Sequence, residues 1–355
     1  RWKFRQVMWY SYLQYDVLGP VSRAAGMDCE CPLYPADLRA KIDSTRLFYK
    51  GREVFMKAKY ITPAVTVFSE DGSIHFEEQG KVYEHLIAGG VDGILILGSI
   101  GEFFPLSMEQ KKELIRFAVK TIDHRVRLIA GTTSMIFDEI LELSEYADQE
   151  GVDGVMVLPP YYFPISEAGM VTYFGKIAES LPQTNLYLYN FPDRTGCDIT
   201  PDVTVELVKK YENIKGYKDT QAGMDHTREL IRRVKAIRPD FEIYSGFDDN
   251  FAHNILAGGD GCIAGLSNVF PRLTSGWAEA FRKEDLKRVQ EIQERIDALM
   301  QIYQVGKPFV PYIKAAMQEE GILTTPKASF PFPEVTEEDR VRIRSILPEG
   351  HLDAE

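Results

Sequence analysis

Short apolar runs rich in β-branched residues recur along the chain from about residue 56 onward. Several are almost continuously apolar, which is typical of parallel strands covered on both faces. Amphipathic stretches separate them, as at 107–122, where Leu114, Phe117 and Ile122 mark one helical face. The eight runs cover residues 61–68, 93–99, 127–133, 154–160, 185–191, 214–220, 241–247 and 261–268. Their alternation with helices predicts an α/β protein with a (β/α)8, or TIM, barrel.

The segments "GGVDGILIL", "EGVDGVMVL" and "GGDGCIAGL" support this count, because each ends a predicted helix with glycine and begins a strand. An open, doubly wound sheet is the alternative architecture. Such a sheet usually has a glycine-rich phosphate-binding turn after its first strand, and none follows 61–68. The barrel is therefore favoured.

The barrel is predicted to occupy residues 56–275. Helical patterns at 283–304, 307–321 and 336–350 predict a C-terminal helical extension over 276–355, which either covers the flank of the barrel or contacts another subunit. Residues 1–55 lack a sustained helical or strand period and are interpreted as an N-terminal extension, with Met56 a plausible start of the protein.

Composition narrows the classes of function. With 45% hydrophobic and 26% charged residues, the chain resembles an ordinary globular protein. A net charge of −12 argues against a surface for nucleic acid or anionic membrane, both of which need a basic face. No run approaches the roughly 18 apolar residues of a membrane-spanning helix. We expect a protein that acts on a small molecule in the cytoplasm.

The cysteines are too few and too scattered to form a disulfide framework, which fits a reducing compartment. Cys29 and Cys31 form a lone C-x-C, with no second cysteine or histidine pair at the spacing of metal ligands. No metal site is expected.

Barrel enzymes build their sites from the C-terminal ends of the strands, and Lys218 falls at the end of the sixth predicted strand. Removal of a lysine from water disfavours its ammonium form, and a neutral amine can form a Schiff base with a carbonyl substrate. The iminium then acts as an electron sink. The alternative is a structural lysine that pairs with Asp219 or Asp248 at the rim.

Schiff-base chemistry also needs proton transfer. Tyr189, at the end of the neighbouring predicted strand, is a candidate acid/base. Ser99 and Tyr162 end two other strands and could relay its proton, although a packed tyrosine and a turn serine are the simpler interpretations. Ile263, in the eighth apolar run, is a further candidate substrate-binding residue.

The motifs "GSIGEFFPLS", "LPPYYF", "LYNFPDRTGCDITP", "IKGYKDT", "YSGFDD" and "GGDGCIAG" resemble, in this order and spacing, the superfamily of dihydrodipicolinate synthase and N-acetylneuraminate lyase. The resemblance spans about residues 58 to 320. It implies that Lys218 forms an imine with pyruvate, that Tyr189 is the acid/base, and that Ser99 and Tyr162 complete a relay, with Tyr162 serving a neighbouring subunit. It also implies a homotetramer and no cofactor.

By the same resemblance, the "GSIG" turn holds the carboxylate of pyruvate, with the amides of Ser99 and Ile100 as donors before a helix N-terminus. The family more often has Thr or Ser at the position of Ile100, so a second hydroxyl is missing here. Arg194 resembles the arginine with which dihydrodipicolinate synthases bind aspartate semialdehyde, and a guanidinium suits a carboxylate. Its alternative role is an ion pair with Asp193 or Asp198.

These observations predict a lyase that joins or splits pyruvate and an aldehyde. The motifs favour a 2-keto-3-deoxy sugar acid as substrate over aspartate semialdehyde, with N-acetylneuraminate third. A barrel that binds a keto acid without catalysis is the remaining alternative, and it would have no need for Lys218.

Overall fold

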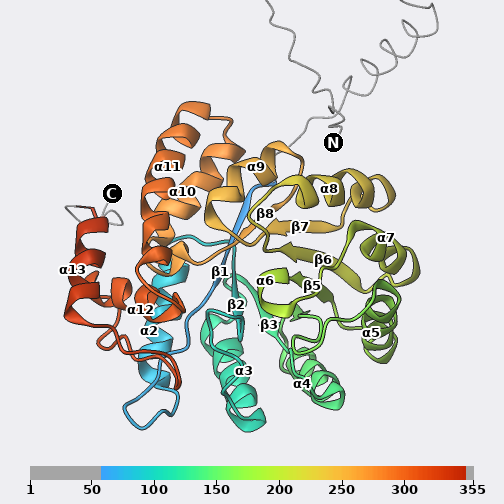
Figure 1. Ribbon diagram of the computed structural model, residues 1–355, viewed down its shortest axis with the longest axis horizontal. Coiled ribbons are helices and arrows are strands. Elements are labelled where there is room, and N and C mark those ends of the chain that lie inside the picture. Colours follow the sequence, from blue (N-terminus) through green and yellow to red (C-terminus); the bar gives the residue numbers. More distant parts are fainter. Residues whose placement is uncertain (1–56, 349–355) are drawn as a thin grey trace, which may run out of the picture. The chain divides into compact units, whose positions relative to one another are not determined.

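The computed structural model describes residues 57–348, so the predicted N-terminal extension, Cys29 and Cys31 lie outside the described residues. Eight parallel strands form a closed barrel in sequence order, with the last strand paired to the first (Figure 1). This confirms the predicted (β/α)8 barrel. The strands are β1 (Lys59–Pro63), β2 (Gly93–Ile96), β3 (Arg127–Gly131), β4 (Gly154–Val157), β5 (Leu186–Asn190), β6 (Ile214–Asp219), β7 (Glu242–Ser245) and β8 (Gly261–Ile263).

The helices that surround the barrel pack their apolar faces against it, and six of the twelve described α-helices begin at a side-chain cap. The α3 helix, for example, begins after Ser107, which forms a capping box with Gln110. The helices are α2 (Phe76–Ala88), α3 (Met108–Ile122), α4 (Phe137–Glu150), α5 (Glu167–Ser180), α6 (Pro192–Thr195), α7 (Pro201–Lys210), α8 (Asp225–Ile237), α9 (Phe251–Leu256), α10 (Pro271–Arg282), α11 (Leu286–Leu299), α12 (Val310–Glu319) and α13 (Glu337–Ile346). No helix of residues 57–348 is both long and apolar enough to cross a membrane.

The Asp-Gly pairs at the starts of three strands have a structural role. Asp92, Asp153 and Asp260 directly precede β2, β4 and β8, and each carboxylate accepts a backbone N–H from the preceding strand at 2.8, 2.7 and 2.9 Å, respectively. The glycine after the last of them is required sterically. Gly261 has a φ of +147°, and a Cβ there would lie 1.9 Å from the carbonyl oxygen of Lys59.

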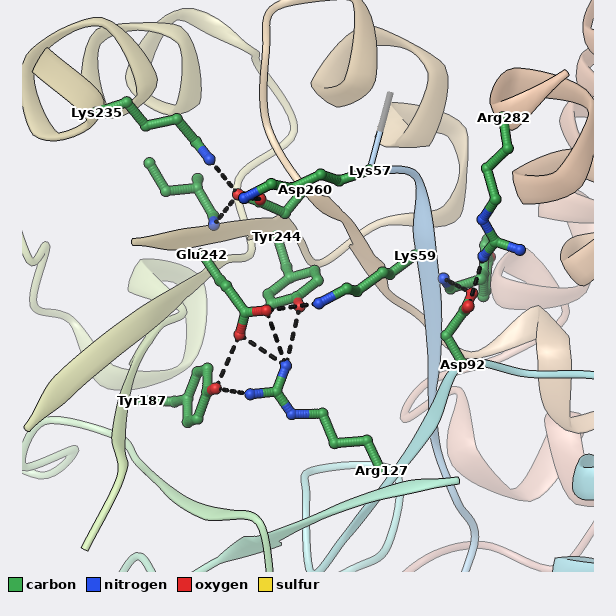
Figure 2. Close-up of polar contacts among 12 residues, drawn as sticks. Lys57, Lys59, Asp92, Arg127, Tyr187, Lys235, Glu242, Tyr244, Asp260 and Arg282 are labelled. Atoms are coloured by element: carbon green, nitrogen blue, oxygen red, sulfur yellow. Dashed lines mark hydrogen bonds and ion pairs between the residues drawn. The ribbon is translucent and has the colours of Figure 1, made fainter. Parts of the chain in front are cut away.

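The N-terminal end of the barrel is closed by a polar cluster (Figure 2). The carboxylate of Glu242 accepts hydrogen bonds from Lys59 Nζ at 2.7 Å, Arg127 Nη1 at 2.7 Å and Tyr187 OH at 2.8 Å. Burial alone would raise the pKa of Glu242, but the charge of Arg127 and the hydrogen bond from Lys59 outweigh it and lower the pKa to about 2. The cluster therefore holds a charged carboxylate at the end of the barrel opposite to the strand tips.

The predicted C-terminal helices appear as α11, α12 and α13, with a 3-10 helix, η3 (Met300–Gln304), between the first two. The domain boundary predicted at residue 275 falls inside α10, which continues to Arg282. A buried ion pair joins this part to the barrel: Lys314 of α12 donates to Glu102, which follows β2. Glu102 also accepts from the backbone N–H and the hydroxyl of Ser329, both at 2.7 Å.

Candidate active site

A cavity of about 640 Å³ lies at the C-terminal ends of the strands. Strand ends supply Lys218 from β6, Tyr189 from β5 and Ile263 from β8, while the segment after β2 supplies Ser99 and Ile100. All five were predicted from the sequence to be site residues, and the barrel brings them together. The cavity size is within the usual range for small-molecule sites.

Lys218 and Tyr189 form the centre of this cavity. They are register partners across β5 and β6, each only 4% exposed, and Lys218 Nζ lies 4.2 Å from the centroid of the Tyr189 ring. Among the described residues, no carboxylate pairs with Lys218. Asp219 instead accepts from Thr227 and contacts His226, and Asp248 accepts from Tyr60 and Tyr303. The structural alternative, a lysine paired at the rim, is therefore not observed.

Ser99 contacts the proposed acid/base directly, because its Oγ lies 3.3 Å from the hydroxyl of Tyr189. The turn that carries Ser99 is conformationally unusual: Leu97 and Glu102, on either side, have φ values of +55° and +52°. Such left-handed non-glycine residues are uncommon and often mark functional loops. The α3 helix begins only at Met108, so this turn does not directly precede a helix N-terminus, contrary to expectation.

Tyr162 is the one predicted relay residue that does not line the cavity of its own chain. Its side chain is 78% exposed, and its ring packs edge-on against Phe163 with centroids 4.8 Å apart. Of the three residues of the predicted relay, only Ser99 and Tyr189 line the cavity of their own chain.

Arg194, from the short helix α6, lines the cavity mouth and is exposed to solvent. Its guanidinium carbon lies 5.6 Å from the centroid of the Phe191 ring, a cation–π distance. The expected alternative, an ion pair with Asp193 or Asp198, is not found in the part of the chain that the structure describes. The guanidinium is therefore available to an anionic ligand.

Sequence reasoning missed the residues that the C-terminal extension contributes to the cavity, which include Tyr303, Lys307 and Phe309. The hydroxyl of Tyr303 donates to Asp248 at 2.7 Å, and Tyr60 donates to the other oxygen of that carboxylate at 2.5 Å. Burial raises the pKa of Asp248, although these two hydrogen bonds oppose the rise. The break between the helical patterns near residue 305 was the only sequence signal for this contribution.

Across residues 57–348, no three His, Cys, Asp or Glu side chains are grouped so as to hold a metal ion. Three reactive groups that line the cavity are the amine of Lys218, the phenol of Tyr189 and the hydroxyl of Ser99. This set can form an imine and move protons, the two requirements of Schiff-base chemistry.

Comparison with known proteins leads to the same family that the sequence motifs resemble. The chain is 35% identical over 292 residues to YagE of Escherichia coli K12, provisionally assigned as a 2-dehydro-3-deoxy-D-gluconate aldolase, with 82% of this chain and 96% of YagE covered. It is 35% identical over 287 residues to YjhH of the same organism, provisionally assigned as a 2-dehydro-3-deoxy-D-pentonate aldolase, with 81% and 95% covered.

Solved structures agree. The crystal structure of YagE, in complex with pyruvate, superimposes with a TM-score of 0.79 at 34% identity and covers 81% of this chain and 97% of that one. Dihydrodipicolinate synthase from Aquifex aeolicus gives 0.76 at 28% identity, with 81% and 96% covered. Residues 56–349 match the Dihydrodipicolinate synthetase family. The chain therefore belongs to the dihydrodipicolinate synthetase family and is a lyase.

Proposed function

We propose that this chain is a class I lyase that cleaves or forms a 2-keto-3-deoxy sugar acid, with pyruvate and an aldehyde as the other reaction partners. The observation that carries the proposal is the buried amine of Lys218, which faces Tyr189 in a cavity and has no carboxylate partner among the described residues. The provisional aldolase assignments of YagE and YjhH support the substrate class.

In the proposed reaction, Lys218 Nζ attacks C2 of the keto acid, and the carbonyl oxygen takes up a proton from solvent and leaves as water, which gives an iminium. The hydroxyl of Tyr189 takes the proton of the C4 hydroxyl as it passes its own proton to Ser99 and on to solvent, while the C3–C4 bond breaks. The electrons of that bond pass into the iminium, which gives an enamine, and the aldehyde departs. The enamine takes a proton from solvent at C3 and becomes an iminium again, and water then hydrolyses it, which releases pyruvate and a proton and restores the amine.

Ser99 has two proposed roles. Its hydroxyl, 3.3 Å from that of Tyr189, passes protons to and from the phenol. Its backbone amide, together with that of Ile100, binds the carboxylate of the keto acid, because both residues line the same cavity as Lys218. Ile100 has the backbone amide donor but no side-chain hydroxyl, so this carboxylate site depends on backbone groups.

Tyr162 is proposed to act in the site of a neighbouring subunit within a homotetramer. It belongs to an exposed apolar surface formed by Phe104, Met135, Ile136, Tyr162 and Phe163, from the segments after β2, β3 and β4. These segments touch, because the backbone N–H of Tyr161 lies 3.5 Å from Met135 Sδ. Exposed apolar surfaces of this kind often form protein interfaces.

The test is reductive trapping. The protein is incubated with pyruvate and sodium borohydride, and its intact mass is measured. A gain of one reduced pyruvyl group that maps to Lys218 is expected, and Lys218→Met is the matched control. An unchanged mass of the wild-type protein would contradict the proposal and favour a barrel that binds keto acids without catalysis.

The second candidate is the condensation of pyruvate with aspartate semialdehyde, and the observation that favours it is the unpaired guanidinium of Arg194 at the cavity mouth. A coupled assay separates the two. If the wild-type protein does not catalyse the condensation, this candidate is removed. If it does, and if Arg194→Ala abolishes the condensation but leaves cleavage of keto-deoxy acids intact, the candidate is supported. N-acetylneuraminate is tested in the same substrate panel.

A further inference from the structure

Behind the two proposed catalytic residues lies a second pair on the same strands. Asn190 and Asp219 follow Tyr189 and Lys218 directly, and they are the next register partners across β5 and β6. Because side chains alternate along a strand, this second pair points away from the cavity, toward the helices. Both side chains are buried, with exposures of 0% and 1%.

The second pair is joined by hydrogen bonds. Asn190 Nδ2 donates to Asp219 Oδ1 at 3.1 Å and to Asp198 Oδ1 at 2.8 Å, while Asn190 Oδ1 accepts the backbone N–H of Ile199 at 3.0 Å. The ends of β5 and β6 are thus connected by side chains as well as by the backbone ladder. A displacement of Asp219 would therefore be transmitted to the adjacent Lys218.

His226 completes the arrangement from the start of α8. Its Nδ1 lies 2.8 Å from Asp219 Oδ2, and its Nε2 lies 3.5 Å from Asp198 Oδ1. The ring is only 12% exposed. Thr227 Oγ1 supplies a second donor to Asp219 Oδ2, at 2.6 Å.

We propose that Asp219 and His226 are positioning residues, and that the imidazolium form of His226 fixes Asp219, and through it Lys218, relative to Tyr189. The inference rests on the proposed lyase function. The chemical basis of the positioning role is the number of N–H donors on the ring of His226. A neutral imidazole has one N–H and can serve only one of the two carboxylates, whereas an imidazolium has two and can serve both.

The surroundings of His226 favour the charged form. The titratable groups that face it within the described residues are Asp219 and Tyr217 of β6 and Asp198 of the segment after α6. Burial lowers the pKa of His226, but the hydrogen bond and charge of Asp219 and the charge of Asp198 outweigh that effect, so the pKa is raised above its usual value of 6.5. The imidazolium therefore persists toward neutral pH.

The experiment compares His226→Asn with the wild-type protein. Asparagine can place an N–H near the position of Nδ1 but does not titrate, so it mimics neutral histidine at every pH. His85→Asn is the matched control, because His85 is a half-buried histidine of α2 outside the cavity. Single-turnover rates of pyruvate trapping with cyanoborohydride are measured from pH 5.5 to 8.5, and thermal unfolding of each variant is recorded.

The ratio of the wild-type rate to the His226→Asn rate is expected to be about tenfold at low pH, where a displaced amine forms the imine more slowly, and to approach one at high pH. The ratio for His85→Asn is expected to stay near one throughout. A ratio for His226→Asn that does not change with pH, in a protein that traps pyruvate, would overturn the positioning role and leave the lyase function intact.

If the wild-type protein traps no pyruvate at any pH, the lyase function fails, and the positioning role fails with it. If His226→Asn does not fold, the wild-type protein still decides the matter. The ring of His226 is then titrated by NMR in the labelled chain, and its midpoint must coincide with an inflection in the trapping rate. An NMR midpoint with no matching inflection would count against the inference.

Discussion

The amine of Lys218 and the ring of Tyr189 face each other across β5 and β6, with 4.2 Å between Nζ and the ring centroid. Neither side chain is held by an ion pair in the described part of the chain. Their relative position is therefore set by the strand register and by the groups behind them. Mutation of the two residues should therefore affect different steps, imine formation for Lys218 and proton transfer for Tyr189.

Tyr189→Phe is expected to form the imine but to cleave keto-deoxy acids about 10²- to 10⁴-fold more slowly, because it removes the proton acceptor and keeps the ring. Trapping with pyruvate and single-turnover cleavage measure the two steps. Tyr173→Phe is the matched control, since that hydroxyl donates to the carbonyl of Leu158 at 3.2 Å, outside the cavity. Full cleavage activity in Tyr189→Phe would show that another group moves the proton.

Mixing two inactive variants tests whether Tyr162 acts between subunits. In a heterodimer of Lys218→Met and Tyr162→Phe chains, one site has both an intact lysine and an intact tyrosine from the partner chain. Random mixing should therefore restore roughly a quarter of the wild-type activity. Steady-state assays after co-expression measure the recovery. No recovery would place Tyr162 in the site of its own chain or outside catalysis.

The cluster at the N-terminal end of the barrel predicts a loss of stability in acid. The pKa of Glu242 falls from its usual 4.5 to about 2, so the charged carboxylate stabilises the fold by about 3 kcal/mol. This contribution is complete above pH 4.5 and is lost as the pH falls toward 2. Glu242→Gln should lower the urea midpoint at pH 7, and its difference from the wild-type protein should shrink below pH 4.5. A difference that is constant with pH would contradict this account.

The buried pair of Lys314 and Glu102 predicts strong coupling between the C-terminal extension and the turn of Ser99. Lys314→Met alone leaves a buried carboxylate without its cation and should cost about 3–5 kcal/mol of unfolding free energy. Burial lowers the pKa of Lys314, and the charge of Glu102 opposes this. The double variant with Glu102→Gln should recover much of the loss, as measured by urea unfolding. Additive losses in the double-mutant cycle would show that the two residues are independent.

The architecture was predictable from the sequence because the strand pattern and the helix pattern of the barrel each extend over only a few neighbouring residues. Nearly continuous apolar runs specify strands covered on both faces, and the intervening stretches specify helices. The ends of the strands were less predictable. The run at 61–68 was expected to be a strand throughout, yet β1 ends at Pro63, and residues 64–68 are buried beyond the end of that strand.

The location of the central candidate residues was also predictable, since a rule of the fold places every strand end on one face of the barrel. Only three strands had to be assigned correctly to predict that Lys218, Tyr189 and Ser99 lie on this face. Pairings between distant segments needed the three-dimensional structure. The contacts of Asp219 with His226, of Lys314 with Glu102 and of Tyr303 with Asp248 depend on helix orientation, which no local period encodes.

The amino-acid pattern thus determined the barrel and the strand ends that carry the amine and the phenol, because alternation and burial act over a few neighbouring residues. Tertiary packing alone decided which carboxylates are already engaged, and hence that Lys218 and Arg194 remain without carboxylate partners in the described structure. It also decided that η3 and α12 reach the cavity. The physical reason is that hydrogen bonds and ion pairs form over a few ångströms in space, whatever the separation of their residues in the chain.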